Sequence, residues 1–462
     1  MIVLERRVAW LFRAALKRCP DTSARNSDQT AVQIHLTKDG LVMHASAPEI
    51  TVSYTDPSQT GKGVFTFPIA HFAEMEGRNA ERIEIAPLRP DMAGARWTHQ
   101  GRTREMEIPL AEPDTVAKVP ALPTKFSPMP SSFLKALDEV SQATASEATK
   151  YAISRIQLRG KAGQIVGTDT RQLLVNGGFA FPFTEDVLIP RSGIFGLQPL
   201  QGGDDVAIGM TDTHLFIKVG PWLFAFVIDK QGRYPDSTQI IPRKAQAETR
   251  FRLDADDAQR FLDNLVRRIK GPAAKENAVT LDLMETPTLR YEIDGRVTEV
   301  NLVNSEVDGK RLRMCLNLSQ LLRALELRFQ EFEIRDANKP IVARDGERIY
   351  LSMPLPPSSA LPPSPDAFKV STAPAPRGAL VPVKRRTHSS IAVPSTQTPV
   401  MENGIDILGE AEGLRDGLLK VAAHAGKILR FLRSVGTQQR IVDFARTSLL
   451  ALGHQVTHGG KE

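Results

Sequence analysis

The sequence is poor in the residues that form cross-links, metal sites and catalytic centres. Cys19 and Cys315 are the only cysteines among 462 residues, so the chain can form neither a disulfide framework nor a cysteine-rich metal site. The nine histidines are scattered, and the chain lacks both a glycine-rich phosphate loop with its lysine and a nucleophile elbow. We therefore expect no enzyme activity, no catalytic residue, no metal and no cofactor, and a reducing compartment, the cytoplasm.

Long apolar runs are also missing. No segment approaches the roughly 18 consecutive apolar residues that a membrane-spanning helix needs, and residues 1–19 carry too many charges for the apolar region of a signal peptide. We therefore expect a soluble protein without a membrane partner. The net charge is +6, and the chain after residue 355 has 13 Lys or Arg against eight Asp or Glu. A nearly neutral body with basic helices indicates a surface charged on one side.

The chain does contain the same order of elements three times, at a spacing of about 120 to 130 residues. An amphipathic helix opens each copy, because apolar residues recur at intervals of three or four. These residues are Leu11, Phe12, Ala15 and Leu16, then Phe133, Leu134, Leu137 and Val140, then Phe261, Leu262, Leu265 and Ile269.

A second, shorter helix follows about sixty residues later in each copy. We expect it to be opened by Pro68, by Pro190 and by Asn317, since Pro suits a first helical turn and Asn suits an N-cap. Alternating apolar residues between the helices predict strands, as in residues 32–43, where Asp39-Gly40 is a hairpin turn.

These patterns predict an α+β fold of three similar domains, each with two helices on antiparallel sheet. The expected domains are residues 1–122, 123–247 and 248–355. Residues 356–401 are rich in Pro, Ser, Ala and Thr and include Lys384-Arg385-Arg386, so we expect a disordered linker. Residues 402–462 keep helical spacing on both sides of Gly436 and predict a helical hairpin tail.

Three segments of the middle third resemble the bacterial DNA sliding clamp, the beta subunit of DNA polymerase III. They are GTDTRQLLV (167–175), DVLIPRSGIFGL (186–197) and GRYPDSTQIIPRK (232–244), in the order and at the spacing of that family. The segment IYLSMPL (349–355) is similar to the family's C-terminal motif. The resemblance covers about residues 1–355 and implies a head-to-tail homodimer that encircles double-stranded DNA, with two helices of each domain facing inward.

The resemblance implies that basic residues on or beside the inner helices contact DNA phosphates without reading bases. An aromatic, Tyr151, matches a residue that clamps place near DNA, and burial in the core is its alternative role. The expected DNA-binding residues are Arg13, Lys17, Arg25, Lys135, Tyr151, Arg191, Arg260, Arg267 and Arg323. Any one of these basic residues could equally be an ordinary solvated side chain of a helix.

The resemblance also implies a peptide-binding cleft between the second and third domains, where DNA polymerase III, the clamp loader and other proteins with clamp-binding motifs insert a short segment. Its residues would be Ile153, Thr168, Thr170, Arg171, Leu173, Pro242, Leu351, Met353 and Pro354. Core packing is the alternative role of Leu173, Leu351 and Met353.

Three departures from the family's pattern indicate a changed preference of this cleft. Thr170-Arg171-Gln172 lies where the family has Gly-His-Arg, and Gln320 lies where the family has a Tyr. A Phe of the family has no counterpart near Glu276. Asp169 and Asp236 belong to motifs in which acidic residues cap turns. The favoured function is a cytoplasmic, nucleoid-associated DNA sliding clamp, and the alternative is a clamp-fold paralogue that holds a protein assembly without encircling DNA.

Overall fold

The computed structural model describes residues 1–20, 30–113, 116–147, 149–202, 205–266, 277–293 and 295–371. All of them belong to one compact body, Met1–Arg377. The predicted hairpin tail (402–462) and residues 372–401 of the predicted linker lie outside the described residues.

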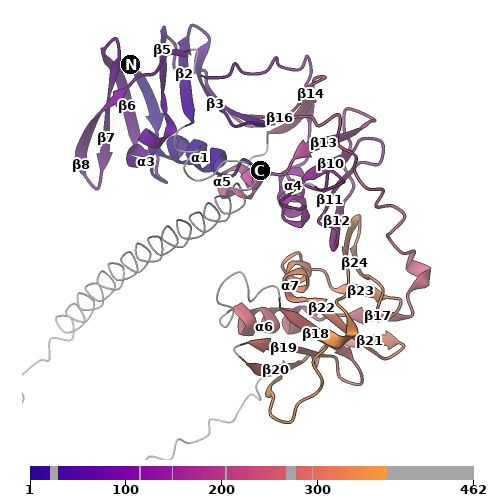
Figure 1. Ribbon diagram of the computed structural model, residues 1–462. Helices are drawn as coiled ribbons and strands as arrows, with labels where there is room; N and C mark the ends of the chain where they lie inside the picture. Colours follow the sequence, from indigo (N-terminus) through magenta and orange to yellow (C-terminus); the bar gives the residue numbers. More distant parts are fainter. Residues whose placement is uncertain are drawn as a thin grey trace, which may run out of the picture. The chain divides into compact units, whose positions relative to one another are not determined.

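Four strands form a first sheet in each third of the chain, and their order repeats three times (Figure 1). These strands are β2 (Ala31–Thr37), β3 (Gly40–Ser46), β4 (Ile50–Asp56) and β5 (Gly63–Pro68); β10 (Arg155–Arg159), β11 (Gln164–Thr168), β12 (Gln172–Asn176) and β13 (Asp186–Pro190); and β18 (Ala278–Leu283), β19 (Thr288–Ile293), β20 (Arg296–Asn301) and β22 (Leu312–Asn317). The orders are β5-β2-β3-β4, β13-β10-β11-β12 and β22-β18-β19-β20. We call each third a repeat.

A second four-stranded sheet recurs in the same way. Its strands are β1 (Ile2–Glu5), β6 (Arg82–Arg89), β7 (Met92–His99) and β8 (Arg102–Pro109); β9 (Ser127–Pro128), β14 (Val206–Met210), β15 (His214–Val219) and β16 (Trp222–Val227); and β17 (Thr249–Arg252), β23 (Glu331–Ile334), β24 (Ile341–Asp345) and β25 (Arg348–Ser352). The orders are β1-β6-β7-β8, β9-β14-β15-β16 and β17-β23-β24-β25, and β21 (Glu306–Gly309) extends the last one beyond β17. The three similar units on antiparallel sheet that the sequence predicted are therefore confirmed.

Consecutive repeats join edge to edge. The last strand of the first sheet, β4, pairs antiparallel with β16 of the next repeat, and β12 pairs antiparallel with β25. Each joint has five register pairs, from Trp222↔Tyr54 to Phe226↔Ile50 and from Gln172↔Ser352 to Asn176↔Arg348. Both joints thus use strands at equivalent places of the repeat.

Each repeat packs a long helix against its sheets. These helices are α1 (Arg6–Leu16), α4 (Ser132–Ala143) and α6 (Ala255–Val266). The sequence predicted them, and their Phe residues Phe12, Phe133 and Phe261 are fully buried. Ile269 lies outside the described residues. Among the described helices, none has the length and apolar character to cross a membrane.

The second helices are short, and one prediction about their start is wrong. They are η1 (Ile69–His71) with α3 (Phe72–Met75), η3 (Ile194–Gly196) with α5 (Gln198–Gln201), and α7 (Leu318–Glu326). Asn317 caps α7 as predicted, because its Oδ1 accepts from the Ser319 amide at 2.8 Å. Pro190 instead ends β13, and the helical turn starts at Ile194. Pro190 suits this place because β13 is an edge strand, where the missing N–H of Pro is tolerated.

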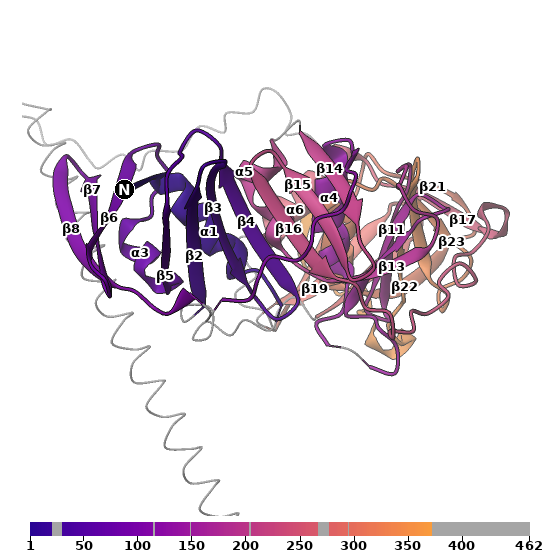
Figure 2. The same cartoon turned by 90° about the horizontal axis from the view of Figure 1, so that it is seen from above.

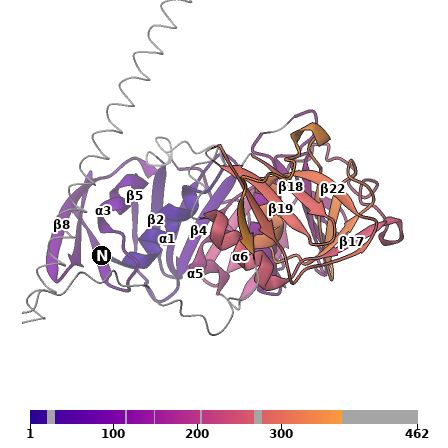
Figure 3. The ribbon, with the colours of Figure 1, turned by 90° about the horizontal axis from the view of Figure 1, so that it is seen from below.

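Residues 356–371, which we expected within a disordered linker, have regular structure. A short helical turn, η6 (Pro357–Ser359), is followed by β26 (Phe368–Ser371), which pairs in parallel with β20. The first sheet of the third repeat therefore has the order β22-β18-β19-β20-β26. Figure 3 shows β18, β19 and β22 side by side in this sheet.

Candidate nucleic-acid surface and peptide cleft

Contacts connect the helices of the three repeats into one row. α1 contacts α3 on one side and η3 on the other, while α4 contacts η3 and α5. Arg323 on α7 donates to Gln142 Oε1 on α4 at 3.4 Å, and α6 packs on α7. The helices that the sequence predicted to share one surface are therefore brought together.

Basic residues cluster where the helices of neighbouring repeats meet. Arg191 donates to the Thr144 carbonyl at 2.9 Å, and its partial burial and the nearby Arg323 charge lower its pKa. Because the partners of Arg191 and Arg323 are neutral oxygens, the two guanidinium charges are not cancelled by these bonds. Such a pair attracts phosphate.

Other predicted DNA-binding residues have different surroundings. Arg13 is ion-paired with Glu76 at 2.9 Å, so much of its charge is compensated. The Lys135 side chain is 70% exposed and lies 3.7 Å from Glu139. Lys17 is exposed, whereas Arg260 and Tyr151 are half-buried. Arg25 and Arg267 lie outside the described residues.

Sequence reasoning missed Arg18, which follows Lys17 at the end of α1. Its guanidinium donates to the Gly193 carbonyl at 3.0 Å, and its own carbonyl accepts from Ser192 Oγ at 3.1 Å. It thereby joins α1 to the η3 turn. Half-buried Asp138 on α4 feels the charges of Arg18 and Arg323, although burial is the larger influence and raises its pKa. Only a basic run at the helix end could have indicated Arg18.

The predicted cleft residues gather around the β12–β25 joint, but its floor is covered. Leu173 and Leu351 are register partners, 1% and 2% exposed, in a small apolar cluster under Tyr234 and Ile241. Ile153 and Thr168 are also buried. The side chains that remain accessible are Thr170, Arg171 and Met353, with half-buried Pro242 and Pro354.

Pro242 faces a separate hollow. It lines a cavity of about 570 Å³ together with Thr238, Arg243, Arg335 and Lys339. Of the predicted cleft residues, only Pro242 lines this cavity, whereas Leu173 and Leu351 lie in the closed apolar cluster.

The residues that depart from the family's pattern form a polar network across the joint. Tyr350 Oη lies 2.8 Å from Gln172 Oε1 and 3.0 Å from the Gln320 carbonyl, and these two acceptors share its single proton. Ser352 Oγ donates to Gln320 Oε1 at 2.6 Å. Burial raises the pKa of Tyr350, which stays protonated as a donor. Thr170 has φ 78°, a conformation that suits Gly and strains a β-branched residue.

The acidic residues of the recognised motifs cap turns, as predicted. Asp169 Oδ1 accepts from the amides of Arg171 and Gln172 at 2.9 and 2.8 Å, and Asp236 Oδ1 accepts from the Thr238 amide at 3.1 Å. Within the described residues, no three His, Cys, Asp or Glu are placed to hold a metal ion. Burial raises the pKa of the Cys19 thiol to about 12, unlike that of a reactive cysteine.

Comparisons with known proteins support the same architecture. No protein-family model matches the chain, and no curated protein is similar to it in sequence. Among solved structures, the DNA polymerase III beta subunit of Pseudomonas aeruginosa has 17% identity and a TM-score of 0.61, over 77% of this chain and 99% of that chain. The sliding clamp of Bacillus subtilis has 17% identity and a TM-score of 0.61, over 77% and 98%. The Borrelia burgdorferi beta subunit has 14% identity and a TM-score of 0.64, over 77% and 97%.

Three repeats, their two edge-to-edge joints and these likenesses agree with one another. The chain therefore has the fold of the DNA polymerase III beta subunits, the DNA sliding clamps.

Proposed function

We propose that this protein is a DNA sliding clamp that closes around duplex DNA as a head-to-tail homodimer. The equivalence of its joints carries the proposal. β4 pairs with β16, and β12 pairs with β25. The next joint of the same kind would pair β20 with β8, which ends its own sheet (Figure 2). These strands lie in the third and first repeats, so two copies would provide two such joints and a ring of six repeats.

The row of helices supports a lining that contacts phosphates. Lys135, Arg18, Arg191 and Arg323 come from different repeats or their borders, and no base-reading geometry is needed for sliding. Arg13 contributes less because of its ion pair with Glu76.

The accessible part of the cleft supports a protein-tethering role in the cytoplasm. DNA polymerase III, its clamp loader and other proteins with clamp-binding motifs would place an apolar anchor on Met353 and Pro354, beside Arg171. Deeper entry requires Tyr234 and Ile241 to move off Leu173 and Leu351. We therefore expect a narrower range of bound peptides than an open apolar pocket would take.

Retention on DNA of different topology tests this proposal. A clamp loaded by a clamp loader should remain on a nicked circle and leave the same DNA after it is linearised, because a ring slides off a free end. A triple variant, Lys135→Ala, Arg191→Ala and Arg323→Ala, should bind DNA more weakly than the parent protein. The slope of log K against log salt concentration should also become shallower, by about 0.9 for each phosphate that is no longer neutralised.

The matched control removes three positive charges from strands, by Arg89→Ala, Arg96→Ala and Lys218→Ala. It should bind and slide like the parent protein. Equally weakened retention in the two triple variants would contradict a DNA-facing role of the helix row.

A second function, a protein scaffold that does not encircle DNA, is favoured by one observation. β26 occupies the β20 edge that the ring needs. Such a scaffold would bind peptides at the cleft but would show no retention on either the circular or the linear DNA.

A further inference from the structure

Three segments cross the first sheets on the face turned away from the helices. The first connector, residues 110–113 and 116–126, follows β8, and the second connector, residues 228–248, follows β16. Residues 356–371, which we name the cap, follow β25 in the same way. The cap therefore takes the course of a connector, although no further repeat follows it among the described residues.

The connectors fasten to polar side chains of the sheets that they cross. Gln33 Nε2 on β2 donates to the Pro113 carbonyl at 2.6 Å. Arg159 Nη2 on β10 donates to Ser237 Oγ at 2.6 Å. Strand residues that would otherwise face water are buried beneath both segments.

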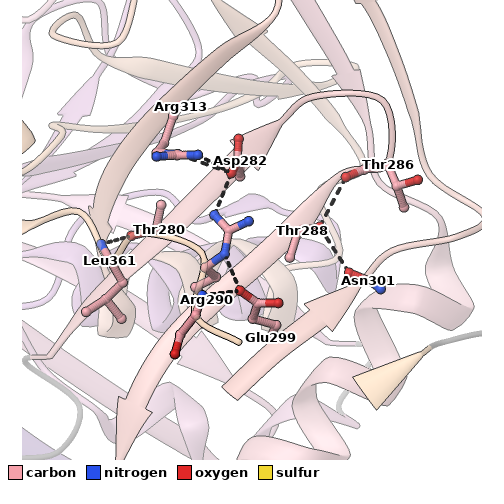
Figure 4. Close-up of polar contacts among 10 residues, drawn as sticks. Thr280, Asp282, Thr286, Thr288, Arg290, Glu299, Asn301, Arg313 and Leu361 are labelled. Atoms are coloured by element: carbon pink, nitrogen blue, oxygen red, sulfur yellow. Dashed lines mark hydrogen bonds and ion pairs between the residues drawn. The ribbon is translucent and has the colours of Figure 1, made fainter. Parts of the chain in front are cut away.

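The cap fastens to the third sheet by the same kind of contact. The Leu361 amide donates to Thr280 Oγ1 at 2.7 Å, and the Ser364 amide donates to Glu299 Oε1 at 3.3 Å. Figure 4 shows Leu361 beside Thr280 above this face. The cap then reaches the sheet edge, where Phe368–Ser371 form β26.

The face beneath the cap consists of paired charges. Arg290 donates to Asp282 at 2.5 Å and to Glu299 at 2.8 Å, and Arg313 reaches Asp282 at 2.9 Å (Figure 4). Asp282, Arg290 and Glu299 are only 3%, 6% and 7% exposed. Because this face is ionic, lifting the cap would hydrate charges, and Val370 is the one residue of the cap that packs on the apolar core. Undocking therefore costs little of the hydrophobic free energy that holds an ordinary core segment in place.

β26 lies where the repeat places a joint strand. In the first two repeats this position beside β4 and β12 is taken by β16 and β25. β26 binds β20 through four register pairs in parallel orientation, against five antiparallel pairs at each joint. Parallel pairing is slightly less stable per residue. Of its residues only Val370 is half-buried, and the other three are exposed. β26 is thus a shorter and weaker occupant of the same edge.

We propose that the cap regulates ring closure by competing with β8 of a second copy for the β20 edge. This inference rests on the proposed head-to-tail dimer. With the cap docked, the edge is occupied and the ring stays open; when β26 leaves, β8 of the second copy pairs with β20. β8 spans eight residues and has exposed residues along most of its length, so it can form a longer ladder than β26.

The test releases and locks the cap in the full chain. Val370→Asp places a carboxylate at the half-buried position and should release β26, whereas Val370→Ile keeps the apolar contact as a control. Asn301→Cys with Ser371→Cys joins register partners, which neighbouring strands bring within the distance that a disulfide spans. The oxidised protein holds the cap shut, and the same protein after reduction is its control. Dimer dissociation constants are measured by sedimentation equilibrium, and β20 amide exchange reports whether the cap is docked.

We expect Val370→Asp to dimerise about tenfold more tightly than Val370→Ile, because removing a competing state raises apparent affinity. The oxidised double-cysteine protein should stay monomeric and should dimerise after reduction. If all forms dimerise equally, including the oxidised one, the cap does not compete for the β20 edge. That result would leave the proposed head-to-tail ring unaffected. If β20 amides exchange faster in Val370→Asp and every form remains monomeric at tens of micromolar, both the ring and its regulation are overturned.

Discussion

The β12–β25 joint and the β20–β26 edge occupy equivalent places in the repeat but are built differently. At the joint, five antiparallel pairs cover an apolar cluster around Leu173 and Leu351, and Tyr350 bonds across it to Gln172. At the edge, four parallel pairs adjoin a face of paired charges. The joint resembles a permanent core, whereas the edge is suited to exchange.

This difference shows how one repeated architecture can hold a fixed contact and a changeable one. Apolar surface makes separation costly, so the joint should stay closed as long as the protein is folded. Ionic surface can be hydrated, so the edge can change partners without unfolding the sheet below. Substitutions in the two places should therefore have different consequences.

The largest effect is expected from Leu173→Asp in the joint. An unpaired carboxylate in this apolar cluster should lower the free energy of unfolding by about 4 kcal/mol or more. Urea denaturation of the full chain measures it. Met353→Asp is the control, because Met353 directly follows β25 and is 39% exposed. This substitution should leave the free energy of unfolding nearly unchanged while removing peptide binding. A stable Leu173→Asp protein would show that the joint is not a core.

Arg290→Ala should have the next largest effect. It leaves Asp282 and Glu299 without their shared cation, and breaking a buried pair should lower the free energy of unfolding by about 3 kcal/mol. Arg313→Ala should cost less, because the Arg313 side chain is 35% exposed and Arg290 still neutralises Asp282. Faster amide exchange in β26 of Arg290→Ala would show that the network also holds the cap; equal destabilisation of both variants would argue against a buried network.

Tyr350→Phe should weaken the joint by a smaller amount. It deletes the hydroxyl that bonds Gln172 and Gln320 and leaves a buried acceptor unsatisfied, which should lower the free energy of unfolding by about 1–2 kcal/mol. Thermal unfolding measures the change. A variant as stable as the parent would mean that the polar network contributes nothing to joining the second and third repeats.

Thr170→Gly should change the free energy of unfolding least, and it should raise this free energy instead of lowering it. Thr170 has φ 78°, and Gly relieves this strain at the cost of a more flexible unfolded chain, for a net gain of about 0.5–1 kcal/mol. Denaturation midpoints of the two proteins decide the point. Lower stability of Thr170→Gly would indicate that the Thr side chain makes interactions that outweigh the strain.

The parts that sequence reasoning predicted are those fixed by local chemistry. Asn317 caps its helix and Asp169 caps its turn because each side chain bonds to amides two or three residues away. The burial of Phe12, Phe133 and Phe261 follows from helical spacing alone. Gly40 has φ 136°, a backbone conformation that residues with a Cβ rarely adopt, so the predicted hairpin turn also has a local cause.

The parts that could not be predicted depend on distant segments. The Pro-rich composition of residues 356–371 is that of a linker, and these residues dock on distant strands of the sheet β18–β20, through Thr280, Glu299 and the β20 edge. A signal was present in those strands, where Asp282, Arg290 and Glu299 alternate with apolar residues. Likewise, no spacing shows that Tyr234 covers Leu173, because 61 positions separate them in the sequence.

The burial of both native thiols has a practical consequence for observing the edge. Cys19 and Cys315 are buried, and burial raises the pKa of both thiols, that of Cys19 to about 12, so that they present little thiolate to an alkylating dye at neutral pH. A fluorophore attached through one cysteine introduced on β26 and a second attached on β20 would therefore report their separation against a dark background. Exchange at this edge could then be followed in single molecules, in real time, without first removing either native cysteine.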